Sequence, residues 1–473
     1  MGTRTGKHNA VVPRADSLRR PGTVWASFGA TVIAVGLSLG LVADLSPTRL
    51  LWHATVGVSA LSVVVALWRM WLMLMARPAS LETTGAPCPR YTVIVPLFRE
   101  AHMVPQLVES LGRLDYPADR LDIVFACEAV DGPTCEAARA VTHPLFRTLV
   151  LPPAEPGGEP QTKPRALNHV LRRSHGELVT IYDAEDRPDP QQLRHAAAAF
   201  AQNPHWDALQ APLDYFNTGD GWLARQFGLE YAGLFHVLLP AFARLGLPFP
   251  LGGTSNHMRR SALEAVGGWD PFNVTEDADL AFRIAAHGGG IGWIAPPTQE
   301  EACHRLRPWQ KQRSRWLKGF MQTWLVHMKA PGAGGWRRAL MLQLTIGLSL
   351  LSVAFFAPVM LALALWVLAD LSGIVDGGLR PLFLGALGLS LCAGMAVGAL
   401  GAVRVGKPHL LWSVPVMPLY WLLMFPPLLR AFRELRTDPY RWHKTEHGVT
   451  GARPELPQPD SRTWTPAKTS ASP

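Results

Sequence analysis

Long apolar runs stand at both ends of the chain and frame a central stretch in which apolar and polar residues alternate over short distances. The two N-terminal runs cover about Thr23–Ala43 and Trp52–Ala76, and each approaches the ~20 residues that a helix needs to cross a bilayer. The polar residues 44–49 between them are enough for a tight turn. The pattern predicts an N-terminal transmembrane hairpin within residues 23–76.

Three further apolar runs lie in the C-terminal part, at about Ala339–Ala369, Pro381–Val403 and His409–Leu429. Three full crossings would leave the basic residues of 430–444 outside the cell, against the tendency of Lys and Arg to stay in the cytosol. The last run contains four prolines, and irregular backbone is tolerated at membrane depth where protein covers it. We therefore expect a broken or re-entrant last segment in a transmembrane region over 339–431, followed by a cytosolic tail over 432–473.

The central stretch, residues 89–336, has the pattern of an α/β domain. Short β-branched runs alternate there with helical segments, and this alternation predicts a largely parallel sheet. Ligands of such sheets bind beyond the carboxyl ends of the strands, where acidic residues gather in this sequence. The expected strands are Tyr91–Leu97, Leu121–Cys127 and Glu177–Tyr182, and the expected helices include Met103–Arg113 and Lys163–Arg173.

Composition supports a membrane protein and argues against a nucleic-acid-binding protein or a disulfide-framework protein. Hydrophobic residues make up 48% of the chain, which is high for a soluble enzyme. The formal net charge is +9, but the basic residues cluster beside the apolar runs and no nucleic-acid-binding motif is present, so nucleic acid is not expected as a partner. The five cysteines have neither metal-ligand nor disulfide-framework spacing. Residues 1–22 are polar and basic, which predicts a disordered cytosolic tail.

Three carboxylates crowd the turn after the third expected strand: Asp183, Glu185 and Asp186. Like charges this close repel unless a hard cation joins them, and Mg²⁺ or Mn²⁺ bridging a diphosphate is such a cation. The alternative interpretation is a helix N-cap before residues 191–200, since Asp caps helices well. The turn taken alone does not decide between the two.

Two basic residues, Lys163 and Arg165, stand at the start of an expected helix. A helix N-terminus with Lys and Arg attracts anionic phosphate. The alternative is a solvated basic first turn. Basic residues stand at the unfavourable end of the helix dipole, which favours a functional role for them.

A candidate general base lies in the segment Thr275-Glu276-Asp277. A hydroxyl that attacks the anomeric carbon of a sugar must lose its proton, and the Asp277 carboxylate can accept it. One such carboxylate is enough when metal and basic groups stabilise a leaving nucleotide diphosphate, whereas glycoside hydrolysis commonly pairs two. The alternative is a cluster of acids that caps the helix expected over 278–286.

The segment Gln312–Trp316 combines guanidinium groups, which bind diphosphate oxygens, with an indole face on which a sugar can stack. It directly precedes the C-terminal apolar runs. The alternative is a basic, aromatic helix at the membrane interface, and both interpretations can hold together.

These motifs, in this order, resemble those of membrane-integrated family 2 glycosyltransferases, related to cellulose, hyaluronan and poly-N-acetylglucosamine synthases and most similar to bacterial exopolysaccharide-type members. The resemblance spans almost the whole chain. The segments that carry it are TVIVPLFRE (92–100), TKPRALN (162–168), YDAEDRP (182–188), LGGTSNH (251–257), NVTEDADL (273–280), QRSRW (312–316) and WHKTEHG (442–448).

The resemblance implies a cytosolic α/β domain of the GT-A fold inserted between transmembrane helices, a UDP-sugar donor, a divalent metal and inversion at the anomeric carbon. Asp277 would be the base. The implied donor contacts are Glu128, Asp131, Lys163, Arg165, Asp183 and Arg315; the implied acceptor contacts are Gln312, Trp316 and Glu276; the implied metal ligands are Asp183, Glu185 and Asp186; and the implied gating residues are Trp442, Lys444, Thr445 and His447. The paired acids usual after the second strand read Val130-Asp131 here, so the uridine contact falls to Asp131 or Glu128.

The first functional expectation is a transferase that extends a polysaccharide at the cytosolic face of a bacterial inner (plasma) membrane and exports it through its own spans. Its expected partners are the UDP-sugar, the polysaccharide, membrane lipids and exopolysaccharide-assembly proteins. One alternative is a transferase that adds a single sugar to a lipid acceptor. A further alternative, a non-catalytic membrane scaffold, is disfavoured by the intact acids.

Overall fold

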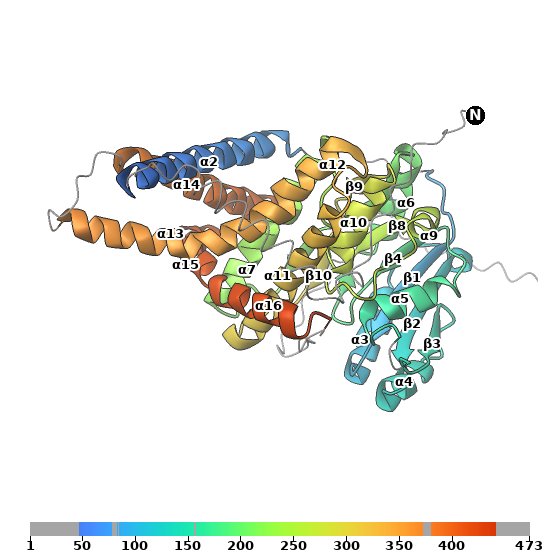
Figure 1. The fold of residues 1–473 in the computed structure, drawn as a ribbon. Helices are drawn as coiled ribbons and strands as arrows, with labels where there is room; N and C mark the ends of the chain where they lie inside the picture. The colour runs from blue at the N-terminus through green and yellow to red at the C-terminus, as the bar shows by residue number, and fades with distance from the viewer. Residues whose placement is uncertain (1–46, 78–82, 84, 156–157, 372–379, 441–473) are drawn as a thin grey trace, which may run out of the picture.

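The computed structural model describes residues 47–77, 83, 85–155, 158–371 and 380–440. A mixed α/β domain forms one end of the molecule and a group of long helices forms the other (Figure 1). The expected first span, Thr23–Ala43, and the WHKTEHG motif lie outside the described residues and remain predictions.

A seven-stranded sheet forms the centre of the α/β domain, in the order β3-β2-β1-β4-β8-β6-β9. Its strands are β1 (Tyr91–Leu97), β2 (Leu121–Glu128), β3 (Phe146–Leu151), β4 (Leu178–Ile181), β6 (Trp206–Gln210), β8 (Asn256–Arg259) and β9 (Gly290–Trp293). Strands β1 to β4 pair in parallel, as the alternating pattern predicts, but β8 runs antiparallel to both β4 and β6. The sheet is therefore mixed rather than largely parallel.

The reversed direction of β8 follows from the edge of the sheet at which the chain enters it. The chain enters β8 from the glycine pair of residues 252–253, beside the carboxyl end of β4: the Ser255 backbone N–H donates to the Ile181 carbonyl over 2.9 Å. A strand that begins at that edge must run back across the sheet. The reversal places the segment LGGTS next to the acidic turn after β4.

A second sheet of three short strands lies beside this edge, in the order β5-β10-β7. Its strands are β5 (Arg187–Pro188), β7 (Leu213–Tyr215) and β10 (Thr298–Glu300). Strand β5 follows the acidic turn directly, and β10 pairs with it from much later in the sequence. This pairing carries Glu300 towards the acids after β4.

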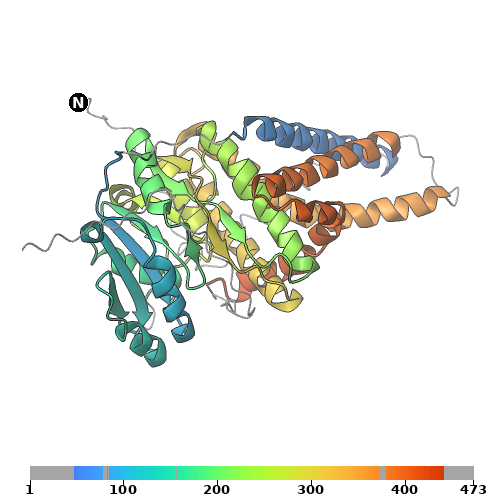
Figure 2. The same cartoon turned by 180° about the vertical axis from the view of Figure 1, so that it is seen from behind.

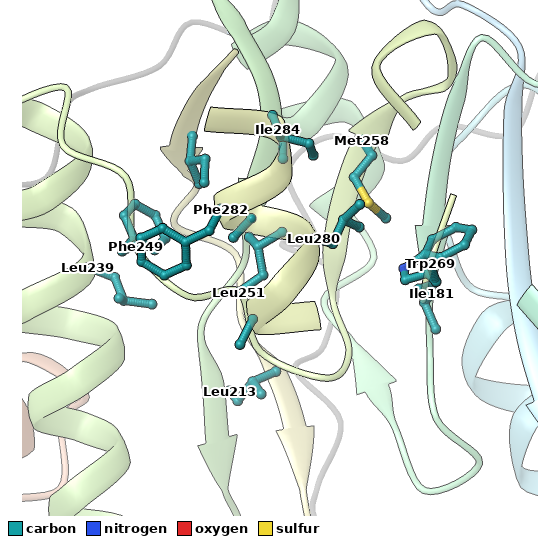
Figure 3. Packing of buried hydrophobic residues seen from close by; sticks show 14 of the residues in the cluster. Ile181, Leu213, Leu239, Phe249, Leu251, Met258, Trp269, Leu280, Phe282 and Ile284 are labelled. Carbon is teal, nitrogen blue, oxygen red and sulfur yellow. The ribbon is translucent and has the colours of Figure 1, made fainter. Parts of the chain in front are cut away.

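Alternate residues of β1 pack into separate hydrophobic clusters, because successive side chains of a strand point to opposite faces. Val93 and Val95 join one cluster, which includes Leu107 of helix α3 (Val104–Leu111). Ile94 joins the other, which includes helix α10 (Glu276–Ala286). Figure 3 shows this second cluster, with residues of α10 among those of β4, β8 and the segment that precedes β8.

The remaining helices of the α/β domain surround the sheet and continue into the helical end. They are α4 (Gly132–Arg139), α5 (Lys163–Leu171), α6 (Gln192–Gln202), α7 (Trp222–Gly233), α8 (Leu239–Arg244), α9 (Arg260–Ala265) and α11 (Leu306–Met328). Short 3-10 helices cover Ala101–Met103 and Ala118–Arg120, and a π-helical segment, Leu234–Leu238, joins α7 to α8.

The helical end consists of apolar helices together with two amphipathic helices, α12 and α16. Its elements are α2 (Pro47–Met75), α12 (Gly335–Leu342), a π-helical segment (Gln343–Gly347), α13 (Leu348–Leu371), α14 (Arg380–Arg404), a 3-10 helix (Pro408–Val416), α15 (Met417–Leu422) and α16 (Phe425–Thr437). In the described part of the chain, four helical stretches are long and apolar enough to cross a membrane: Thr55–Met75, Gly335–Leu368, Pro381–Arg404 and Pro408–Thr437. The last is broken at its prolines, as the sequence predicts.

Helix α14 packs closely against both α2 and α7, and α2 and α14 lie side by side in both views (Figures 1 and 2). The contact with α7 depends on Gly401, because a Cβ atom there would lie 2.3 Å from the backbone carbonyl carbon of Ala232. Glycine at this position therefore allows the apolar helices to contact the backbone of the α/β domain.

Candidate active site

The turn after β4 is closed by Asp186. Its carboxylate accepts hydrogen bonds from the Asp183 backbone N–H, over 2.7 Å, and from the Thr254 hydroxyl, and its side chain is fully buried. Helix α6 starts only at Gln192, whose backbone N–H donates to the Asp189 carbonyl, so the N-cap interpretation of this turn is wrong. Asp186 thus holds the turn, while Asp183 and Glu185 line a cavity.

Lys163, the first residue of α5, joins this turn to the glycine pair. Its ammonium group donates to the Asp183 carboxylate and, over 2.7 Å, to the Gly253 carbonyl. The side chain is only 13% exposed, so the interpretation as a solvated basic turn is wrong. Burial lowers the pKa of Lys163, but nearby carboxylates, above all Asp183, outweigh burial and raise it. Lys163 therefore carries a fixed positive charge between the acids of the site.

Glu128 and Arg165 form an ion pair at the carboxyl end of β2, with 3.2 Å between Nη1 and Oε2. Burial raises the pKa of Glu128 although Arg165 opposes the shift. Asp131 accepts a hydrogen bond from the Arg99 backbone N–H, and Arg99 adopts a φ of 58°, so Asp131 fixes the loop after β1. Glu128 lines the cavity, whereas Asp131 and Arg165 are not among its lining residues, so Glu128 is better placed than Asp131 for a nucleotide contact.

Helix α10 begins with the pair Glu276 and Asp277 at the cavity wall. Burial raises the pKa of Asp277 to about 6, against the lowering effect of backbone N–H groups, Lys163 and Arg315. Burial and the neighbouring Asp277 also raise the pKa of Glu276. The acids do lie in the first turn, where the dipole favours them, but Asp277 also faces the cavity and has the pKa of a useful base.

The third acid of this turn, Asp279, has a structural role. Its buried carboxylate accepts from Arg283 Nε over 2.6 Å and pairs with His327 Nε2 over 3.0 Å. Burial alone would raise its pKa, but Arg283 and His327 outweigh burial and lower the pKa to about 2. The network ties α10 to α11 and so positions Asp277.

The predicted acceptor and donor residues of α11 line the cavity: Gln312, Arg315 and Trp316. Between them, Arg313 turns inward and donates to Glu230 over 2.8 and 2.5 Å and to the Tyr420 hydroxyl over 2.7 Å. Its guanidinium carbon lies 4.5 Å from the centroid of the Trp316 ring. Arg313 therefore packs against the indole and holds it in place, a role that was not predicted from the sequence.

Another residue missed from the sequence is Glu300, at the end of β10. It lines the same cavity, and burial together with Asp186, Glu185 and Asp183 raises its pKa well above the usual value. The pairing of β10 with β5 and with β7 brings it there. For Arg313 a signal did exist, since residues 309, 313 and 316 share one helix face by their spacing.

The cavity that these residues line has a volume of about 1220 Å³ and two chemically distinct ends. One end contains the acids and the basic residues described above. The other lies among α2, α13 and α14 and is lined by apolar side chains that include Trp68, Leu72 and Phe356. A single space therefore connects the candidate base with the apolar helices.

The C-terminal end of the described chain returns to this cavity. Lys318 and Gln322 of α11 donate to the backbone carbonyls of Asp438 and Pro439, over 3.3 and 2.9 Å. Tyr440 lies at the cavity wall, its ring centroid 5.3 Å from that of Phe272. The predicted gating residues Trp442, Lys444, Thr445 and His447 lie outside the described residues and remain predictions.

Residues 178–426, more than half of the chain, match the family model described as glycosyl transferase family group 2. The chain belongs to this family. The predicted family is confirmed at this level.

The chain of this family 2 glycosyltransferase is 27% identical over 390 residues to the β-monoglucosyldiacylglycerol synthase of Synechocystis sp., covering 78% of this chain and 77% of that protein. It is 26% identical over 244 residues to the glucomannan 4-β-mannosyltransferase 2 of Arabidopsis thaliana, covering 50% and 46%. The mannosyltransferase PcManGT of Pyrobaculum calidifontis, solved with GDP-Man and Mn²⁺, superposes with a TM-score of 0.52 at 20% identity, covering 80% of this chain and 97% of that one, which shows the shared GT-A-like fold.

Proposed function

We propose that this protein is a membrane-integrated, inverting glycosyltransferase that moves a sugar from a nucleoside-diphosphate donor to a hydroxyl of a lipid acceptor. The observation that carries the proposal is the cavity, because it joins Asp277 to a space walled by apolar helices. A lipid can lie along that wall with its polar end at the acids. The similarity to a synthase of monoglucosyldiacylglycerol, a lipid product, supports the same reading.

The donor would bind at the carboxyl ends of β1, β2 and β4. Glu128 would contact the nucleoside, and Lys163 and Arg315 would neutralise the diphosphate. We propose a UDP-sugar as the donor. The test below compares UDP-sugars with GDP-sugars directly.

A divalent cation fits the acidic turn. Asp183 and Glu185 offer carboxylate oxygens at the cavity wall, the ligands that Mg²⁺ and Mn²⁺ prefer. Burial and the neighbouring Asp183 and Glu100 raise the pKa of Glu185, and a cation bound at its carboxylate would favour the ionised form. Asp186 is less suited, because its carboxylate is engaged in closing the turn. When bound, the cation would stabilise charge on the leaving diphosphate.

The chemistry assigned to the chain's own residues is a single displacement. Asp277 takes the proton of the acceptor hydroxyl, and the hydroxyl oxygen bonds to the anomeric carbon as the bond from that carbon to the diphosphate oxygen breaks. Trp316, which Arg313 holds in place, would stack against the acceptor. Attack opposite the leaving group inverts the anomeric configuration.

A growing polysaccharide is the second candidate acceptor. The similarity to glucomannan mannosyltransferases favours it, as does the position of Gln312 and Trp316 at the cavity wall beside the apolar helices. Under this reading the chain would extend and export a glycan, with the exopolysaccharide-assembly partners expected from the sequence. The two readings predict products of different size.

The test is incubation of the detergent-purified protein with UDP- and GDP-sugars, Mg²⁺ or Mn²⁺ and either lipid or oligosaccharide acceptors. We expect a lipid that carries one sugar, identified by mass spectrometry. A product ladder of increasing length on an oligosaccharide would instead select the polysaccharide reading. An Asp277→Asn protein that still transfers sugar at the wild-type rate would refute the assigned base.

A further inference from the structure

One charged residue, Arg69, interrupts the apolar face that α2 turns to the cavity. The cavity-lining residues of α2 recur at helical spacing, and most of them are apolar: Val58, Leu61, Ser62, Val65, Trp68, Arg69 and Leu72. Among the described cavity-lining residues of α2, α13 and α14, Arg69 alone carries a charge. A guanidinium in apolar surroundings is costly and points to a function when it faces an internal space.

The protein satisfies little of the hydrogen-bonding capacity of Arg69. A guanidinium has five N–H donors, whereas the structure gives Arg69 one hydrogen bond, from Nη1 to the Ser390 carbonyl of α14 over 3.3 Å. Within the described part of the chain it forms no ion pair with a carboxylate. The remaining donors are therefore available to a ligand in the cavity.

The facing helix is shaped to accept this guanidinium. Gly394 of α14 lies against it, and a Cβ atom there would be 3.1 Å from Arg69 Nη1 and 3.0 Å from the ring of Trp421. A larger residue at this position would crowd both the guanidinium and the indole. The position on α2 and the glycine on α14 thus form one arrangement around the charge.

Arg69 also lies close to one end of its helix. It is six residues from Met75, the end of α2, which is about 9 Å along the helix axis, compared with a hydrocarbon core of about 30 Å. Leu72 and Ala76, just beyond it, belong to the core cluster shared with the α/β domain. The charge is therefore near the domain end of the apolar helices.

We infer that Arg69 binds the phosphate of an anionic lipid whose hydrocarbon chains lie along the cavity wall formed by α2, α13 and α14. The inference rests on the proposed lipid acceptor and extends it: the phosphate belongs either to the acceptor itself or to a membrane phospholipid bound beside it. Arginine suits this ligand because its planar donors match phosphate oxygens in pairs. A neutral lipid would leave the charge unmatched.

The test uses delipidated full-length protein in a non-ionic detergent and three dioleoyl lipids. Phosphatidylglycerol offers a phosphate and a hydroxyl, diacylglycerol offers only the hydroxyl, and phosphatidic acid offers only the phosphate. Native mass spectrometry measures phosphatidic acid binding, and labelled donor measures transfer. Arg69→Gln should weaken phosphatidic acid binding by about ten-fold or more, the usual effect of losing a charge-assisted hydrogen bond.

Three further variants make the result interpretable. Arg69→Lys keeps the charge and should retain part of the binding. Gly394→Ala crowds the guanidinium and should weaken binding less than Arg69→Gln does. Arg433→Gln is the matched control, since Arg433 is exposed on α16 and does not line the cavity. Equal phosphatidic acid binding by Arg69→Gln and wild type would overturn the inference.

The transfer arms separate the two sources of phosphate. If phosphatidylglycerol is glycosylated with a KM that rises in Arg69→Gln, the phosphate belongs to the acceptor. If only diacylglycerol is glycosylated, and phosphatidic acid accelerates that reaction through Arg69, the phosphate belongs to a bound phospholipid. If no lipid is glycosylated while phosphatidic acid still binds through Arg69, the anion site stands and the proposed lipid acceptor fails.

Discussion

The raised pKa of Asp277 predicts how the transfer rate depends on pH. The carboxylate must be ionised to accept the hydroxyl proton, and burial raises its pKa from 3.8 to about 6. With that pKa, about 90% of the base is ionised at pH 7 but only about 10% at pH 5. The rate should therefore fall about ten-fold from pH 7 to pH 5. An unshifted carboxyl would stay ionised over this range, and the rate would hardly change.

The assay is kcat/KM for a neutral acceptor at saturating donor, measured from pH 5 to 8. Arg315→Gln provides an internal check, because Arg315 lowers the pKa of Asp277 and its removal should move the acidic limb to higher pH. Asp277→Asn should lose about 10²- to 10⁴-fold in rate, and isothermal titration should show donor binding close to wild type. A profile that stays flat between pH 5 and 7 would refute either the role of Asp277 as the base or the raised pKa of its carboxyl.

Three further predictions concern the residues around the site. Arg313→Met should lower the free energy of unfolding by about 2–3 kcal/mol, less than the roughly 3–5 kcal/mol typical of a broken buried pair because the Glu230 side chain is 31% exposed. The thermal midpoint in detergent measures this loss, and an unchanged midpoint would contradict the stabilising role of the Arg313–Glu230 pair. Asp279→Asn should lower the thermal midpoint at pH 7. The pKa of Asp279 is about 2 in the folded protein and 3.8 in an unperturbed carboxyl, so the difference in midpoint between wild type and variant should shrink as the pH falls from about 4 towards 2. A difference in midpoint that does not depend on pH would contradict the ion network. Gly401→Val should separate α14 from α7 and reduce the yield of folded protein in size-exclusion chromatography. Gly57→Val is the control, because Gly57 has open space around it and the yield should not change. Equal yields of the two variants would contradict the close contact.

Local sequence patterns predicted the parts of the fold that depend on near neighbours. Strands β1 and β2 and helix α5 lie where their β-branched runs and helical spacing placed them, to within two residues at either end. The direction of β8 was not accessible in this way, because it depends on pairing between β4 and residues about 80 positions later. The same limit applies to Glu300, which reaches the site through short strand pairings.

The site shows a similar division. Acids after β4 and at the start of α10 could be named because parallel strands end at one edge of a sheet. Whether each acid faces the cavity could not, since Asp183 and Asp186 are three residues apart and yet one lines the cavity while the other closes the turn. Arg313 and Glu230 are separated by 83 residues, so their pairing follows only from the packing of α11 on α7.

The close approach of α14 to α7 at Gly401 has a consequence for how substrates are chosen. Since backbone meets backbone there, the catalytic half cannot tilt or slide against the apolar helices without losing the contact. Asp277 is then held at one constant height above the apolar region. For the proposed lipid acceptor, this fixed height limits how far the reacting hydroxyl can lie from the hydrocarbon chains, in addition to any recognition of its phosphate by Arg69.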